Sequence, residues 1–194
     1  MIHNLLSKYN IILGSASPRR KELLQEIGLE FTIKTTDKDE KHPNDIGDNK
    51  IAEFLAKQKS SFLSEDLKDN ELLITADTIV SFNNQLLHKP INKDSAFQTL
   101  SKLSGNTHKV ITGVCIKTKQ KEVVFSTTTK VIFNQISDKE INFYINNYNP
   151  FDKAGAYGIQ DWIGQIGIKK IEGSYSNVVG LPTSELYEHL KSFV

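Results

Sequence analysis

The chain has 194 residues, of which 38% are hydrophobic and 24% are charged, and its formal net charge is +1. This composition is typical of a globular protein, and so small a net charge argues against a nucleic-acid-binding surface. The one cysteine, Cys115, excludes an internal disulfide, and no apolar run approaches the ~20 residues of a membrane span. The N-terminus lacks a signal-peptide pattern, so we expect a cytoplasmic protein that contacts neither membrane nor nucleic acid.

The first half of the chain predicts alternating strands and helices. Apolar periodicity, a proline at a helix start and a glycine at a helix end set the boundaries. The expected elements are a strand at 11–13, a helix at 18–27, a strand at 31–35, a helix at 50–63 and a strand at 71–82. Asn83 and Asn84 then indicate a hairpin turn.

The second half continues the pattern. The expected elements are a helix at 94–105, strands at 108–118 and 121–133 that pair antiparallel, a helix at 137–147, a loop at 151–160, one strand with a turn within 166–182, and a last helix capped by Thr183 or Ser184. Together these predict an α/β fold, with a mixed twisted sheet, flanking helices and two lobes around a deep cleft. We expect residues 1–194 to form a single domain.

The junction between the first strand and the first helix carries unusual chemistry. It contains Ser15, Ser17, Arg19 and Arg20. Backbone N–H groups at a helix start, short hydroxyls and guanidinium forks together suit the oxygens of a polyphosphate. The alternative is a surface helix with a basic first turn, although cations there oppose the helix dipole.

Asp77 interrupts the most apolar strand of the chain. A carboxylate is costly to bury unless it is paired or binds a metal. If the strand ends at Thr75, Asp77 lies at its carboxyl tip, where open α/β sheets bind ligands. It could then hold Mg²⁺ and activate a water, or simply cap a turn.

The remaining candidates are ambiguous from composition alone. Lys59, Lys89 and Glu40 are by default solvated surface charges. His108 has no partner histidine at metal-ligand spacing, which favours a structural hydrogen bond. Gln160 has an amide that could both donate to and accept from the edge of a base, or belong to an ordinary tight loop.

Six blocks in fixed order resemble the Maf family of nucleoside triphosphate pyrophosphatases. They read LGSASPRRKELL, ADTIV, HKP, LSGNTHKVITGV, DKAGAYGIQ and IEGSYSNVVGLP, and they span almost the whole chain. The resemblance implies a two-lobed α/β fold, related to pyrophosphatases that act on inosine triphosphate. It also implies hydrolysis of a nucleoside triphosphate between its α- and β-phosphates, which releases pyrophosphate.

The resemblance also implies roles for single residues. Asp77 matches the proton acceptor for the attacking water, and Glu40 with Asp77 matches the position of a Mg²⁺ or Mn²⁺ ion. The positions that match phosphate contacts are Ser15, Arg20, Lys59 and Lys89. The positions that distinguish the branch acting on dTTP and UTP are Arg19, Thr78 and Gln160.

Two functions from different classes follow. The first is an enzyme that hydrolyses dTTP and UTP and removes non-standard nucleotides, in a family that allows a homodimer. The second is a non-catalytic nucleotide-binding regulator of cell division. A carboxylate placed to activate water favours the enzyme, because binding alone does not need one.

Overall fold

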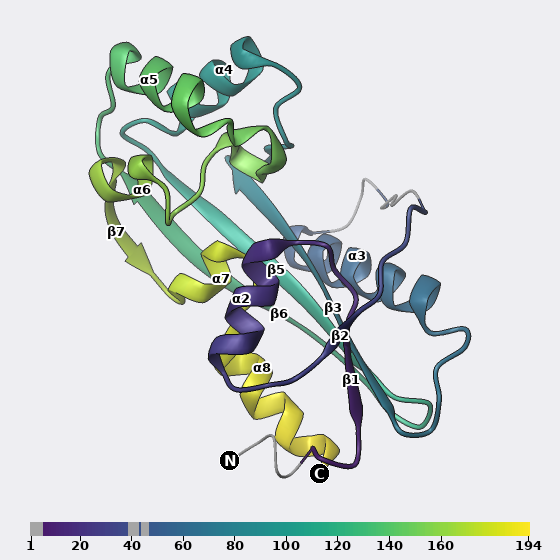
Figure 1. The fold of residues 1–194 in the computed structure, drawn as a ribbon. Helices are drawn as coiled ribbons and strands as arrows, with labels where there is room; N and C mark the ends of the chain where they lie inside the picture. The colour runs from purple at the N-terminus through teal and green to yellow at the C-terminus, as the bar shows by residue number, and fades with distance from the viewer. Residues whose placement is uncertain (1–5, 39–42, 44–46) are drawn as a thin grey trace. The chain divides into compact units, whose positions relative to one another are not determined.

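A computed structural model describes residues 6–38, 43 and 47–194 (Figure 1). The strands form one mixed sheet in the order β2-β1-β3-β5-β6-β7, with β4 paired to β3. The strands are β1 (Asn10–Leu13), β2 (Thr32–Ile33), β3 (Glu71–Phe82), β4 (Gln85–Leu86), β5 (Thr107–Lys117), β6 (Glu122–Phe133) and β7 (Ile168–Glu172). The helices are α2 (Pro18–Glu26), α3 (Asp48–Leu63), α4 (Lys93–Leu103), α5 (Asp138–Tyr148), α6 (Trp162–Gly167), α7 (Tyr175–Val179) and α8 (Thr183–Leu190).

The predicted mixed sheet with flanking helices is confirmed. Residue contacts divide the chain into two compact units. Unit 1 holds the described residues of 1–77, 112–127 and 180–194, and unit 2 holds 78–111 and 128–179. The strands β3, β5 and β6 therefore contribute residues to both units. The single domain and the deep cleft expected from the sequence stay predictions.

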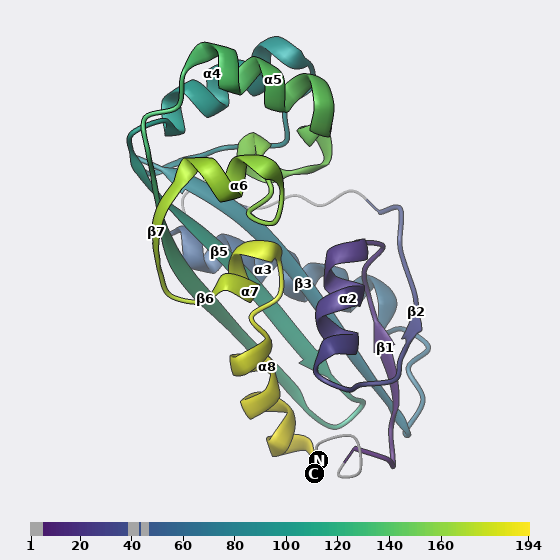
Figure 2. The same cartoon turned by 60° about the vertical axis from the view of Figure 1, so that its left-hand side comes forward.

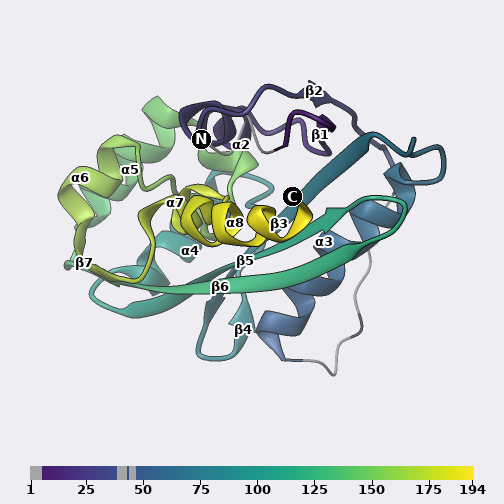
Figure 3. The same ribbon diagram turned by 90° about the horizontal axis from the view of Figure 1, so that it is seen from below.

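In unit 1, helices cover both faces of the sheet. Figures 2 and 3 show α3 on one face and α8 on the other. The ring of Phe125 on β6 stacks on His189 of α8, with ring centroids 4.1 Å apart. An apolar cluster joins β1, α3 and β3, and its buried members are Ile12, Leu63, Leu67 and Leu73.

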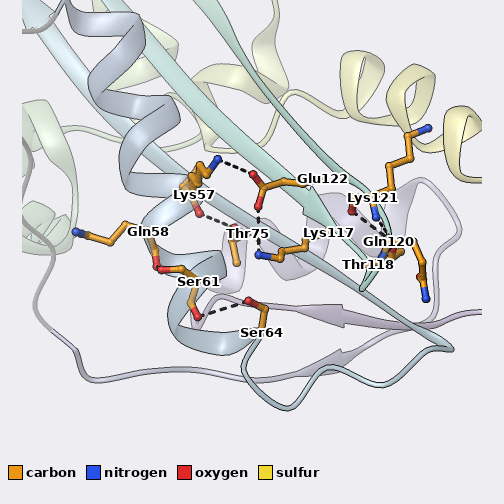
Figure 4. A network of polar contacts seen from close by, with 11 residues as sticks. Lys57, Gln58, Ser61, Ser64, Thr75, Lys117, Thr118, Gln120, Lys121 and Glu122 are labelled. Carbon is orange, nitrogen blue, oxygen red and sulfur yellow. Dashed lines mark hydrogen bonds and ion pairs between the residues drawn. The ribbon is translucent and has the colours of Figure 1, made fainter.

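Polar contacts also fasten α3 to the sheet (Figure 4). The Glu122 carboxylate bridges two lysines, with its oxygens 2.7 Å from Lys57 Nζ and 3.2 Å from Lys117 Nζ. The hydrogen bond from Lys57 is the main cause that lowers the pKa of Glu122. Thr75 is fully buried, and its hydroxyl donates to the Ala56 carbonyl of α3 at 2.7 Å. These contacts fix the position of α3 along β3.

In unit 2, α4 and α5 pack side by side, as Figures 1 and 2 both show. Both helices begin with a capping box, from Asn92 and Ser137 respectively. The predicted hairpin is confirmed, because Asn83 and Asn84 have φ of 51° and 61° between the paired ends of β3 and β4. Two asparagines with left-handed φ suit the twist of a two-residue hairpin.

His108 lies inside the apolar core of unit 2. Only 2% of its surface is exposed, and its Nε2 lies 2.7 Å from Tyr157 Oη. The ring also contacts Phe133 edge-on, with centroids 5.2 Å apart. The expected structural hydrogen bond is confirmed. Burial lowers the pKa of His108 from 6.5 to about 4, because the imidazolium would lose its hydration there.

The short helices α6 and α7 are not among the predicted elements. The sequence of α6 reads WIGQIG, and two glycines in six residues oppose a helix. Packing of the buried Ile163 outweighs that propensity. The predicted cap of α8 by Thr183 or Ser184 is wrong, because Pro182 occupies the N-cap without a side-chain hydrogen bond.

We expect His108 to make stability pH-dependent. The unfolded chain binds its proton near pH 6.5 and the folded chain only near pH 4, so stability is complete above pH 6.5 and falls as the pH decreases toward 4. His108→Gln should be less stable at pH 7 but should lose about 3 kcal/mol less between pH 7 and pH 4. Urea titrations across this range measure the difference, and parallel pH curves for the two chains would contradict it.

We expect the Thr75 hydroxyl to stabilise the α3–β3 contact. Thr75→Val keeps the shape of the side chain but removes the donor to Ala56, so the free energy of unfolding should fall by about 1 kcal/mol. Thr99→Val serves as the control, since its hydroxyl bonds only within its own helix, to the Ser95 carbonyl. Equal stability of wild type and Thr75→Val in urea would show that the contact contributes nothing.

Candidate active site

The parallel pairing of β1 with β3 places the junction after β1 beside the middle of β3. Leu13 pairs with Ile74, and the Gly14 N–H donates to the Ile74 carbonyl at 2.8 Å. A Cβ on Gly14 would lie 2.5 Å from Thr75 Cγ2, so only glycine allows this approach. The residues after Leu13 therefore start alongside the segment that contains Asp77.

At this junction, Ser15 and Arg20 form a connected pair. Arg20 Nη1 donates to Ser15 Oγ at 3.3 Å, and Arg20 Nε donates to the Gly180 carbonyl at 2.9 Å. The Ser17 N–H also donates to Ser15 Oγ, at 3.2 Å. Both Ser15 and Arg20 are half-buried. The guanidinium is thus oriented by two oxygens from opposite ends of the sequence.

The start of α2 supplies further positive character. Ser17 is its N-cap and accepts from the Arg20 N–H at 3.5 Å, and Pro18 occupies the first turn. No acidic residue lies in that turn. The positive end of the helix dipole and the guanidinium charges of Arg19 and Arg20 therefore add, and the junction has the chemistry of an anion site.

Lys59 and Asp77 meet on the α3 face of β3. Lys59 Nζ lies 2.5 Å from Asp77 Oδ1 and 3.5 Å from the Ala76 carbonyl. Both side chains are largely enclosed, with 16% and 17% of their surfaces exposed. Thr75 and Asp77 are two residues apart on the strand, and their partners Ala56 and Lys59 are three apart on the helix. Side chains return to the same face every two residues along a strand and about every turn along a helix, so both contacts lie on the surface where α3 meets β3.

Asp77 does not lie at the tip of its strand, because β3 does not end at Thr75. It continues to Phe82, as predicted for the strand at 71–82, so Asp77 lies within it. The parallel pairing with β1 nevertheless ends at Ile74, three residues earlier. Asp77 is therefore beyond the last parallel pair although β3 itself does not end there. Its neighbours on β5 maintain the strand.

The other predicted site residues lie in unit 1, in unit 2 or outside the described residues. Arg19 is half-buried on α2 in unit 1. Thr78, Lys89 and Gln160 belong to unit 2, where Thr78 is half-buried and the other two are exposed. Glu40 lies outside the described residues. Unit 1 thus brings together Ser15 with Arg20 and Lys59 with Asp77.

Sequence reasoning did not identify Gly180 as a partner of Arg20. The two residues are 160 positions apart, and a backbone carbonyl leaves no side-chain signal in a sequence. The sequence block that contains Gly180, IEGSYSNVVGLP, includes none of the predicted site residues. Its carbonyl is one of the groups that orient the Arg20 guanidinium.

Neither a metal cluster nor a membrane helix is found in residues 6–38, 43 and 47–194. This part of the chain holds no group of three or more His, Cys, Asp or Glu side chains arranged for a metal ion. None of its helices is long and apolar enough to cross a membrane.

Comparison with known proteins relates the whole chain to one family. A dTTP/UTP pyrophosphatase of Flavobacterium johnsoniae is 46% identical over 194 residues, which cover 100% of both chains. One of Flavobacterium psychrophilum is 47% identical over 190 residues, covering 98% of this chain and 97% of that protein. A solved dITP/XTP pyrophosphatase of Mycobacterium abscessus aligns with a TM-score of 0.40 and 13% identity, over 66% of this chain and 74% of that chain. That alignment does not bear on the fold.

The family comparison confirms the resemblance. The Maf-like protein family matches residues 10–193, which include both pairs of site residues in unit 1. With this match and relatives of nearly half-identical sequence at full length, the chain belongs to the Maf-like protein family.

Proposed function

We propose that the chain hydrolyses dTTP and UTP between the α- and β-phosphates, giving the nucleoside monophosphate and pyrophosphate. The relatives named dTTP/UTP pyrophosphatase support this activity. The observation that carries it is the Lys59–Asp77 pair, 2.5 Å apart and largely enclosed. A general base must be held within hydrogen-bond reach of the proton that it accepts, and the contact with Lys59 fixes the position of the Asp77 carboxylate.

In the proposed reaction, Asp77 orients and deprotonates the attacking water. The water oxygen bonds to the α-phosphorus, the bond from that phosphorus to the α–β bridging oxygen breaks, and the electron pair of that bond leaves with the departing pyrophosphate. The proton passes to the carboxylate of Asp77. Lys59 Nζ holds Asp77 Oδ1 at 2.5 Å and so fixes the position of the carboxylate. Positioning and charge stabilisation supply most of the rate in such reactions.

Phosphate binding is assigned to the junction after β1. Arg20 is oriented by Ser15 and Gly180, so its fork needs little reordering when phosphate oxygens arrive. The backbone N–H groups at the start of α2 add donors to the same anion. Lys89 is proposed as a further phosphate contact, on the resemblance alone.

A divalent cation fits part of the donor chemistry. The Asp77 carboxylate is the hard oxygen ligand that Mg²⁺ and Mn²⁺ prefer, and Mg²⁺ sites use one or two carboxylates with substrate phosphates. We propose that Asp77 and Glu40 hold this ion with phosphate oxygens. The ion would neutralise the charge of the triphosphate.

Base selection is assigned to Arg19, Thr78 and Gln160. The exposed amide of Gln160 can donate to one atom and accept from another on the edge of a pyrimidine. Arg19 precedes Arg20 in the sequence but is proposed to have a different role. It would help to select the base, whereas Arg20 would bind the phosphates.

We predict that Asp77→Asn lowers pyrophosphate release from dTTP by about 100-fold or more, because the amide cannot accept the proton. Nucleotide binding should change by only a few-fold. Pyrophosphate is measured colorimetrically over a panel of nucleotides with Mg²⁺, and binding is measured by calorimetry. Full activity of this variant would refute the role of Asp77, and no product from any nucleotide with the wild type would refute the activity.

We predict that Arg19→Trp lowers kcat/KM for dTTP by about tenfold, as expected for loss of a charged hydrogen bond. Arg20→Lys should raise KM for all nucleotides while the ratio of dTTP to dGTP use stays within about twofold. This matched pair separates base selection from phosphate binding. An unchanged ratio in Arg19→Trp would count against its assigned task.

A further inference from the structure

The residue proposed to select the base lies in a tight turn of unit 2. The Asp161 N–H donates to the Gly158 carbonyl at 3.1 Å, which closes a four-residue turn from Gly158 to Asp161. Gln160 is exposed, whereas Ile159 beside it is only 6% exposed. The direction of the Gln160 side chain therefore depends on how firmly this turn is held.

One buried hydroxyl connects both ends of that turn. Tyr144 of α5 has no exposed surface, and its Oη donates to Asp161 Oδ2 at 2.7 Å. The Gly158 N–H in turn donates to Tyr144 Oη at 3.1 Å. Burial, and then the Asp161 carboxylate, raise the pKa of Tyr144, so the hydroxyl keeps its proton and remains a donor.

The geometry around Asp161 leaves little room for another arrangement. A Cβ on Gly158 would lie 2.6 Å from Asp161 Oδ2, so the carboxylate folds back over residue 158. Lys153 Nζ lies 3.8 Å from the same oxygen, and only 13% of the Lys153 side chain is exposed. The Lys153 ammonium is closer to Asp152 Oδ1, at 2.8 Å, so the Tyr144 hydroxyl is the hydrogen-bond partner that holds the Asp161 carboxylate and, with it, the turn.

We propose that Tyr144 and Asp161 are a positioning pair that fixes the turn carrying Gln160 and so sets the preference for a pyrimidine base. This inference rests on the base-selecting role proposed for Gln160. Neither residue of the pair needs to touch the nucleotide. A loosened turn would let Gln160 adopt several orientations, and the ordering cost of binding a pyrimidine would rise.

The test compares Tyr144→Phe with Tyr148→Phe. Tyr148 is on the same helix, its ring stacks on Tyr144 with centroids 5.3 Å apart, and its surface is 39% exposed. Tyr144→Phe should lower the ratio of dTTP to dGTP use by about fivefold or more, as expected for a loss of ~1 kcal/mol. The loss should appear in KM for dTTP, with kcat within about twofold. Tyr148→Phe should keep the wild-type ratio.

A second pair of variants covers the case in which Tyr144→Phe does not fold. Asp161→Asn keeps an oxygen that accepts from the Tyr144 hydroxyl, whereas Asp161→Ala does not. The asparagine variant should retain more selectivity than the alanine variant. Thermal unfolding is recorded for each, because a purely structural role would lower Tm and leave selectivity unchanged. Wild-type selectivity in Tyr144→Phe or Asp161→Ala overturns the inference.

Failure of this inference can be separated from failure of the proposed function. Selectivity is measured both as a ratio of kcat/KM values and as a ratio of Kd values for non-hydrolysable dTTP and dGTP analogues. Gln160→Ala is the reference for full loss. If it loses selectivity but the variants of Tyr144 and Asp161 do not, only the positioning pair is refuted. A wild type that neither hydrolyses nor prefers dTTP refutes both.

Discussion

The register of β1 against β3 is the constraint on which the site in unit 1 depends. Its last parallel pair is Leu13 with Ile74, after which β1 turns into the junction before α2 while β3 continues. Thr75 and Asp77 then project toward α3 and meet Ala56 and Lys59. A slip by one residue would turn both side chains to the opposite face of the sheet. The buried Thr75 hydroxyl bonds to α3, the helix that also brings Lys59 to the Asp77 carboxylate.

Arg19 and Arg20 lie near the positive end of the α2 dipole, and this repulsion destabilises the helix by about 0.3 to 1 kcal/mol for each cation. The fold offsets part of this cost by giving Arg20 two oxygens, from Ser15 and Gly180. Both of these partners are uncharged oxygens, and they set the direction of the guanidinium fork.

Local signals account for most of what the sequence predicted. The apolar run of β3 and the asparagine turn after it are short-range features, and the structure agrees with both. The junction of Ser15 and Arg20 was also recognisable from its chemistry. What the sequence did not predict depends on packing: α6 forms although it contains two glycines in six residues, and its Ile163 is fully buried. The Lys59–Asp77 contact needed the register of a helix against a strand, which no local pattern contains.

The proposed phosphate and base contacts are supported by separate sets of residues. Arg20 is oriented by Ser15 and Gly180 within unit 1, and the turn of Gln160 is held by Tyr144 and Asp161 within unit 2. Effects of substitutions without shared partners usually add, whereas those within one network do not. Substrate preference can therefore change through the turn in unit 2 while the hold on phosphate is retained.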